Sequence, residues 1–490
     1  MQQSHPDSGN QITEFKRELG LFDATMLVIG SMIGSGIFIV SADIARTVGS
    51  SGMLIVVWLI TGVITLIGAL SYGELAAMIP KAGGQYVYLR DAFNPLIGFL
   101  YGWTLFMIIQ TGTIAAVAVA FAKFTAVLIP WFGTNNKLLN ILGLKISAAQ
   151  FLAILNIALL TYINIRGLRE GKFVQDIFTV TKIAALAGLI FLGIIAGSNI
   201  EAVTANFTNM WNAEWLHIKD GGIDWVQSLS GFSIVIAVGV AMVGSLFASD
   251  AWNNVTFTAG ETKNPKRNIP LSLFFGTLIV TVLYILANFS YLLVLPLEGT
   301  PNGSTIQSLG IQFATEDRVA TAAANIFLGE AAAIIMAVLI MISTFGCNNG
   351  LILAGARVYY TMAKDKLFFS GTGTLNKNSV PAKALIFQGV WAGVLCLSGT
   401  YGDLLDYVIF AVMIFYVLTI IGIFILRKKW PDVERPYKAF GYPYLPILYI
   451  ILASSVSVIL LIYKPQYTWP GLIIVLLGVP IYFILRRKWS

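Results

Sequence analysis

About twelve apolar segments, each near the length needed to cross a lipid bilayer, constrain this chain more than any other feature. A membrane-spanning helix needs roughly 20 apolar residues. The chain is 57% hydrophobic and only 11% charged, whereas soluble domains carry about 25% charged residues. A soluble fold could not cover so much apolar surface, so an all-α membrane protein is predicted. The predicted spans are 22–48, 53–79, 95–129, 148–165, 173–195, 231–258, 269–295, 319–363, 382–398, 404–426, 445–463 and 469–485.

The distribution of basic residues predicts the orientation of these spans. If the N-terminus is cytoplasmic, 23 of the 31 Lys and Arg residues lie on the cytoplasmic side, 7 lie outside and Lys182 lies within a span. Lys and Arg concentrate in cytoplasmic loops of membrane proteins. Both termini are therefore predicted to be cytoplasmic, in the cell (plasma or inner) membrane. The same distribution accounts for the net charge of +7 without a nucleic-acid partner.

Residue types that carry metal, redox or hydrolytic chemistry are scarce. Cys347 and Cys396 fall inside apolar runs, while His5 and His217 lie in the tail and in a loop. The sequence has no phosphate loop, nucleophile elbow or metal-ligand cluster. We therefore expect no metal, no cofactor and no enzymatic activity. Residues 1–20 lack a short apolar core, so a cleavable signal peptide is not expected either.

The first span is interrupted by three glycines, Gly30, Gly34 and Gly36. A glycine in a helix interior costs about 1 kcal/mol relative to alanine, so the middle of this span is weakened. Close packing of helices through small residues explains this segment equally well when it is taken alone.

The sixth span is interrupted by polar residues between Phe247 and Asn253, among them Asp250. Carboxylates inside a membrane are expensive and are functional candidates. The two interruptions are five spans apart, and an odd offset reverses direction, which predicts an inverted repeat. Such paired interruptions indicate a transporter's substrate site. The helix ends created there offer N–H groups to a carboxylate and carbonyls to an ammonium, which together match an amino acid.

Four sequence motifs resemble the amino acid–polyamine–organocation superfamily, and within it the L-type amino acid transporter branch. They extend over most of the chain, from Leu19 to about Arg435. The motifs are Gly30–Phe38; Tyr72–Ala76 with Pro80–Tyr86; Phe247–Asn253 with Ala259–Pro270; and Ser343–Gly346 with Asn349, Gly350 and Arg357.

The resemblance implies a leucine-transporter-like fold that works by alternating access. Ten helices at 21–426 would form a five-plus-five inverted repeat, with repeats at about 21–196 and 231–426 and with broken helices 1 and 6. Residues 1–20 would be a cytoplasmic tail, and 427–490 would add two accessory helices and a short cytoplasmic C-terminus.

The resemblance also assigns roles to residues at the two interruptions. The substrate carboxylate would bind the backbone of Ser35, Gly36 and Ile37, and the ammonium would bind carbonyls near Ile33, Phe247 and Ala248. Phe247 would also close over the substrate as an aromatic gate, unless it simply packs, and Asn253 would contact the substrate or polarise the break. Asp250 could bind a cationic group, tune a proton or cap the second half-helix; capping is the favoured interpretation.

Lys182 lies ten residues beyond Lys172, roughly 15 Å deeper and near the bilayer midplane. In the family, a lysine here bridges the broken helix 1 and helix 8, where sodium-coupled relatives bind an ion. The matching partners are Gly34 and Ser343 or Thr344. We therefore expect sodium-independent transport, although a lysine that only lines a wet cavity remains an alternative.

The main hypothesis is an L-amino acid transporter, a sodium-independent exchanger of neutral substrates. The alternatives are a proton-coupled symporter of amino acids or polyamines, using Lys182, Asp250 or Glu74, and an amino-acid-sensing receptor or channel on the same scaffold. Residues 131–147 contain no cysteine, so no disulfide-linked heavy-chain subunit is expected. A salt bridge from Glu74 to Lys81 or Arg90 is predicted, and one from Arg357 to a cytoplasmic acid.

Overall fold

The computed structural model describes residues 15–489 except 142–143, 220–221 and 398–400. Within the described residues, ten helices are long and apolar enough to cross a membrane. Three shorter apolar helices accompany them, at Phe232–Ala248, Val319–Leu328 and Ala382–Leu395. The predicted fold class, an all-helical multi-span membrane protein, is confirmed.

The helices follow the order of the predicted spans, numbered here 1 to 12. Span 1 is divided into α1 (Leu21–Met32), α2 (Gly36–Ile39) and α3 (Ser41–Val48), and span 6 into α11 (Phe232–Ala248) and α12 (Asn254–Phe257). The other spans, in order, are α4 (Ser51–Met78); α6 (Pro95–Thr104), which continues through a π-helical turn η1 (Leu105–Ile109) into α7 (Gln110–Leu128); α8 (Ala148–Arg166); α9 (Leu168–Ile195); α13 (Pro265–Val294); α16 (Ala331–Lys364); α17 (Ala382–Leu395); α18 (Tyr401–Lys429); α19 (Tyr444–Tyr463) and α20 (Pro465–Trp489).

Local sequence signals begin several of these helices. The Ser50 hydroxyl accepts a hydrogen bond from the Met53 amide at the start of α4. Ser147 and Gln150 form a reciprocal capping box at the start of α8. Such caps satisfy the amide groups that have no partner inside the helix. They place the helix ends at polar residues that bound the apolar runs.

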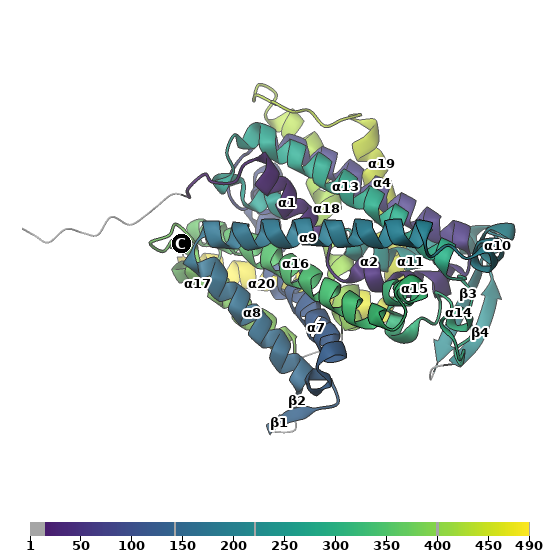
Figure 1. The fold of residues 1–490 in the computed structure, drawn as a ribbon. Coiled ribbons are helices and arrows are strands. Elements are labelled where there is room, and N and C mark those ends of the chain that lie inside the picture. The colour runs from purple at the N-terminus through teal and green to yellow at the C-terminus, as the bar shows by residue number, and fades with distance from the viewer. Residues whose placement is uncertain (1–14, 142–143, 220–221, 398–400, 490) are drawn as a thin grey trace, which may run out of the picture.

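Contacts between helices repeat with an offset of five spans. Span 1 (α1) packs on α9 and α13, and span 6 (α11) packs on their counterparts α18 and α4. The pair α7–α8 recurs as α16–α17, and the pair α9–α16 recurs as α18–α7. Equivalent helices also pack on one another, as α4 on α13 and α7 on α16. Figure 1 shows α9 and α16 across the middle of the molecule, with α4 and α13 on one side and α8 and α17 on the other. An inverted repeat produces this pattern; the residue limits of the repeats stay a prediction.

The structure differs from the sequence prediction at the N-terminal end of span 8. The predicted continuous span 319–363 is two helices, α15 (Val319–Leu328) and α16. They separate at Gly329, whose φ of 59° lies in the left-handed region that glycine tolerates. An apolar run gives no sign of such a break, because both helices bury apolar side chains.

Several short elements join the spans and were not predicted. A short helix, α5 (Gln85–Ala92), lies between α4 and α6. Two antiparallel hairpins, β1–β2 and β3–β4, follow spans 3 and 5. Their bounds, with those of the remaining short helices, are β1 (Lys137–Ile141), β2 (Leu144–Ser147), β3 (Glu214–Lys219), β4 (Gly222–Ser228), α10 (Ile200–Thr208) and α14 (Ile306–Leu309).

Candidate functional site

The break in span 1 separates two helices at three residues. Helix α1 ends at Met32, and Ile33 leaves the helix with φ −75° and ψ 96°. Helix α2 begins at Gly36, after Ser35. The N–H groups in the first turn of a helix have no partner within it, so those of Gly36 and Ile37 face the break. The structure thus places the three residues predicted for the carboxylate together, and all three are buried.

Lys182 on α9 holds the carbonyl side of this break. Its Nζ donates to the carbonyl oxygens of Gly30 at 2.7 Å, Ile33 at 2.6 Å and Ser343 at 3.3 Å. The Ser343 hydroxyl in turn lies 3.2 Å from the Ile33 oxygen and 2.9 Å from the Gly34 oxygen. The lysine therefore joins span 1 to span 8, as the resemblance implies. Its partners on span 1 are Gly30 and Ile33, however, and Gly34 is held by Ser343 instead.

A further contact between spans 8 and 1 comes from Cys347, whose thiol donates to the Ser31 oxygen at 3.1 Å. Thr344 was predicted as an alternative partner of the lysine, but its hydroxyl donates to Ile340 on its own helix at 2.8 Å. A threonine hydroxyl commonly returns to the preceding turn of a helix, and that is the physical reason for the difference.

The break in span 6 is longer than the one in span 1. Helix α11 ends at Ala248, and α12 begins at Asn254. Ala251 between them has φ 65°, in the left-handed region that costs a residue with a Cβ about 1–2 kcal/mol. Such strain is retained where the surrounding structure enforces it, and it often marks a functional site.

Asp250 does not cap the second half-helix, so the favoured sequence interpretation is wrong. The N-cap position of α12 belongs to Asn253, which makes no side-chain cap bond. The unwound segment is long enough to leave Asp250 three residues outside that position. Its Oδ1 accepts a hydrogen bond of 2.6 Å from the hydroxyl of Tyr416 on α18. Asp250 thus links the break to span 10.

A chain of side-chain hydrogen bonds continues from Asp250 toward α5. The Tyr416 hydroxyl is also 3.1 Å from Asn253 Oδ1. Asn253 Nδ2 donates to Gln85 Oε1 at 2.7 Å, and Gln85 Nε2 donates to the Thr419 hydroxyl at 3.0 Å. Sequence reasoning gave no role to Tyr416, a polar residue in an apolar helix, and none to Gln85, although Gln85 lies in the Pro80–Tyr86 motif.

These hydrogen-bonded side chains border a small polar cavity beside the unwound segment. The space open to the centre of a water molecule is about 10 Å³, which is close to the minimum for one water. Its polar lining comes from α5, span 3, span 6 and span 10, through Gln85, Tyr101, Gln110, Thr113, Asp250, Asn253, Asn254 and Tyr416.

The two breaks touch one another. A Cβ added to Gly36 would lie 2.7 Å from the Cβ of Ala248, so only glycine permits this approach. The Tyr284 hydroxyl on α13 lies 3.2 Å from the Met32 oxygen and 3.0 Å from the Ala248 oxygen. One phenol thereby joins the carboxyl ends of α1 and α11. The N–H groups of α2 and the carbonyls of α11 are thus close enough to serve one small zwitterion.

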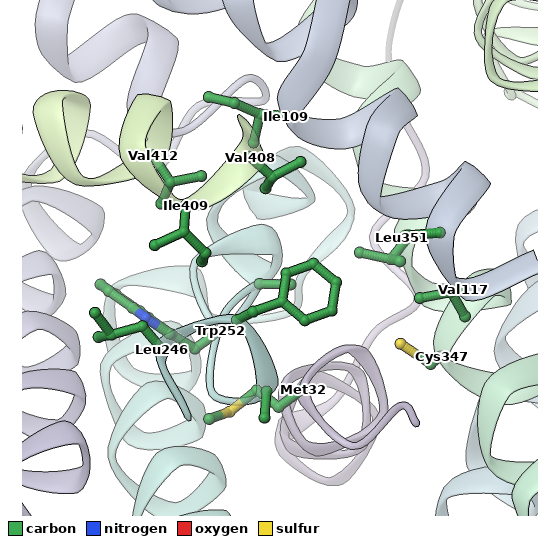
Figure 2. Close-up of a cluster of buried hydrophobic side chains, with 14 of the residues drawn as sticks. Met32, Ile109, Val117, Leu246, Trp252, Cys347, Leu351, Val408, Ile409 and Val412 are labelled. Atoms are coloured by element: carbon green, nitrogen blue, oxygen red, sulfur yellow. The ribbon is translucent and has the colours of Figure 1, made fainter. Parts of the chain in front are cut away.

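Apolar side chains from five spans surround the breaks. Figure 2 shows Met32, Leu246 and Trp252, which belong to spans 1 and 6. Ile109, Val408, Ile409 and Val412 face them from spans 3 and 10, and Val117, Cys347 and Leu351 from spans 3 and 8. The breaks are thus flanked by these apolar side chains and by the polar-lined cavity beside the unwound segment.

Two ion pairs join residues near the ends of different spans. Arg357 makes two hydrogen bonds to Glu261, of 2.9 and 2.8 Å, and both side chains are buried. The predicted pairing of Arg357 with an acid is confirmed. Glu74 pairs with Arg427 at 2.8 and 2.7 Å, not with Lys81 or Arg90. The C-terminal end of span 10 thus contacts span 2. Sequence reasoning did not predict this contact, because the two residues are far apart in the sequence.

Within the described residues, no group of three or more His, Cys, Asp and Glu side chains is placed to hold a metal ion.

Two broken helices in a repeated helical bundle, with helix ends that converge, define a membrane transporter of the inverted-repeat class. The amino acid permease family model matches residues 19–484. The chain belongs to this family and is an amino acid transporter and multi-pass membrane protein.

Several relatives that match nearly the whole chain are named as amino acid transporters or exchangers. The human large neutral amino acids transporter small subunit 2 is 31% identical over 482 residues, 97% of this chain and 82% of the relative. The serine/threonine exchanger SteT of Bacillus subtilis is 31% identical over 476 residues, 96% of this chain and 98% of the relative. The human b(0,+)-type amino acid transporter 1 is 28% identical over 480 residues, which are 96% of this chain and 88% of the relative.

Proposed function

We propose that this protein exchanges neutral L-amino acids across the membrane without sodium, by alternating access at the two broken helices. The observation that carries this proposal is the burial of Lys182 and its contacts with the break in span 1. Its ammonium group is fully buried and is held by three carbonyl oxygens, from Gly30, Ile33 and Ser343. A buried cation needs such partners. A second cation such as sodium would compete for the same oxygens and would meet like charge.

The substrate carboxylate binds the amide groups at the start of α2, from Ser35, Gly36 and Ile37. Hydrogen bonds to a charged group contribute about 1.5–3 kcal/mol each, and the end of the helix adds a favourable partial charge. The close approach of Gly36 to Ala248 supports this assignment, because it brings the start of α2 next to the carbonyl end of α11.

The ammonium group binds the carbonyl end of α11, at Phe247 and Ala248. Ile33 was predicted to share this role. Its oxygen already accepts from Lys182 and lies within hydrogen-bond distance of Ser343. A substrate ammonium at this oxygen would meet the like charge of Lys182. We therefore place the ammonium nearer span 6, with Phe247 as the gate over the bound substrate.

The choice of neutral substrates rests on the apolar side chains around the breaks, including Met32, Ile109 and Val412 (Figure 2). An apolar environment favours an uncharged substrate side chain. The names of the human and bacterial relatives, a large neutral amino acids transporter and a serine/threonine exchanger, are consistent with this class.

Counter-exchange in proteoliposomes tests the proposal. Vesicles preloaded with a neutral amino acid should take up labelled substrate quickly, and empty vesicles slowly. Uptake that is equally fast in empty vesicles would refute exchange. Competition by the twenty amino acids against one labelled substrate then identifies the preferred side chains.

Proton-coupled symport of amino acids or polyamines is the second candidate, favoured by Asp250. This carboxylate is buried and makes no ion pair within the described part of the chain. An imposed pH gradient should accelerate uptake into empty vesicles if the carboxylate carries a proton. Uptake that ignores the gradient would eliminate this candidate.

Orientation and partners follow from the placement of charge and cysteine. We propose that both termini are cytoplasmic, in the cell membrane, because 23 basic residues then lie on that side. Both cysteines, Cys347 and Cys396, are buried. We therefore propose that no heavy chain is linked by a disulfide; non-reducing electrophoresis from native membranes tests this, and a reducible complex would contradict it.

A further inference from the structure

We propose that an anionic phospholipid of the cytoplasmic leaflet binds a groove between α8 and α17, on the lipid-facing side of the molecule. The groove has a volume of about 530 Å³. Figure 1 shows the two helices side by side, away from the broken helices. Its lining is almost entirely apolar and comes from both helices, including Ile154, Ala158 and Tyr162 on α8 and Ile386, Val390 and Val394 on α17.

The groove is held open by contacts at both ends of the helix pair. At the outer end, Gln150 Nε2 donates to the Cys396 oxygen at 3.2 Å. At the cytoplasmic end, Asn376 Nδ2 donates to the Ile165 oxygen at 2.9 Å, and Asn378 to the Arg166 oxygen. The helices are thus fixed at their ends and leave a gap between them. The floor of the groove is closed where Gly389 on α17 packs against α8, since an added Cβ would lie 2.8 Å from the Thr161 side-chain oxygen.

The walls of the groove face lipid. Tyr162 and Val390 are 56% and 64% exposed, and Ile386 is 50% exposed. Apolar side chains that are exposed on a membrane protein contact acyl chains. A fatty acyl chain therefore matches the body of the groove in shape and polarity.

The cytoplasmic end of the groove is basic. The Arg166 guanidinium donates to the Tyr162 hydroxyl at 2.9 Å, which places it at the groove's edge. Lys383 is exposed on the first turn of α17, three residues before the lining residue Ile386. Basic pockets between spans on the cytoplasmic side bind anionic head groups. Charge complementarity thus selects an anionic over a zwitterionic lipid.

Thr161 marks the depth at which the basic end of the groove meets its apolar body. Its side-chain oxygen is buried in the groove, and no hydrogen-bond partner contacts it within the described residues. It lies five residues before Arg166 on α8, about 7.5 Å deeper. That depth is near the boundary between head groups and hydrocarbon. The ester groups of a phospholipid lie at this boundary, so its acyl chain would lie in the apolar groove while its phosphate meets Arg166.

Native mass spectrometry of the purified protein, with phosphatidylglycerol or phosphatidylcholine added, tests the proposal. We expect one phosphatidylglycerol to bind the wild type more tightly than phosphatidylcholine. Ala158→Trp fills the groove from an exposed position and should abolish this binding, whereas Leu155→Trp, on the same helix outside the groove, should retain it. The double variant Arg166→Gln/Lys383→Gln should lose affinity for phosphatidylglycerol by roughly 30-fold, and Arg487→Gln on α20 should not.

Exchange activity of each variant in liposomes shows that it is folded. Equal binding of the two lipids by the wild type would overturn the proposal, and so would equal phosphatidylglycerol binding by Ala158→Trp and Leu155→Trp. A protein dimer, or a co-purified single-span protein, that Ala158→Trp removes would show that another occupant covers this face, and would also overturn it.

Discussion

The two broken helices reach similar shapes by different means. The break in span 1 is short and glycine-rich, and a charged side chain from another span, Lys182, holds its carbonyls. The break in span 6 is longer, and its own polar side chains, Asp250 and Asn253, hold it to span 10 and α5. The first break is therefore stabilised by a side chain from another helix, and the second by its own side chains, which bond to neighbouring helices. Substitutions should affect the two breaks differently.

The largest effect is expected where the breaks touch. In Gly36→Val, the added Cβ would lie 2.7 Å from that of Ala248 and would displace the amides that bind the carboxylate. Loss of two charge-assisted hydrogen bonds should reduce exchange by more than about 100-fold. Gly188→Val on α9, where an added Cβ meets nothing within 4 Å, is the control. Wild-type affinity in Gly36→Val, measured with a labelled amino acid, would remove the carboxylate from this break.

Removal of the lysine should give the next largest effect. Lys182→Ala leaves buried carbonyls without their donor, at a cost of about 1–3 kcal/mol for each unsatisfied group. We expect exchange to fall by roughly 10- to 100-fold. The neighbouring Thr181→Ala should exchange normally, because Thr181 bonds only the preceding turn of α9. Normal exchange by Lys182→Ala would show that the break in span 1 keeps its structure without the lysine.

The span 6 network should respond as a unit. Asp250→Ala and Tyr416→Phe each remove the same 2.6 Å hydrogen bond, and we expect each to slow exchange by about three- to tenfold. The double variant should be no worse than the more damaged single variant, since contacting residues are non-additive. Additive losses would show that the two residues act separately.

The smallest effect concerns backbone strain in span 6. Ala251→Gly relieves the cost of φ 65° but adds freedom to the unfolded chain, for a net gain of about 0.5–1 kcal/mol. Thermal unfolding of the purified protein should shift upward slightly. Ala237→Gly within α11, where the backbone is helical, should shift it downward instead. A downward shift in both variants would mean that Ala251 is not strained.

The sequence predicts span 1 better than it predicts span 6, for physical reasons. Apolar runs locate the helices, and three glycines locate the first break, because both signals are local. The depth of Lys182 also follows from counting along a helix. Its oxygen partners depend on how α1 lies against α9, which no local pattern encodes. The same holds for Tyr284 and Tyr416, which approach from spans 7 and 10.

Asp250 illustrates where sequence reasoning fails. A carboxylate near a half-helix predicts a cap only if the helix begins next to it. The unwound segment extends to Asn253, because the side chains of Asp250 and Asn253 find partners on α18 and α5. Those tertiary contacts decide where α12 begins, and the intrinsic preference for capping is overridden.

The sodium dependence of exchange tests the central claim most directly, namely that Lys182 holds the span 1 break in place of a metal ion. Wild-type protein in proteoliposomes would be assayed with sodium on both sides, and again with choline in its place. The contacts from Lys182 to Gly30, Ile33 and Ser343 predict equal initial rates. A rate that collapses in choline and recovers with added sodium would contradict the account.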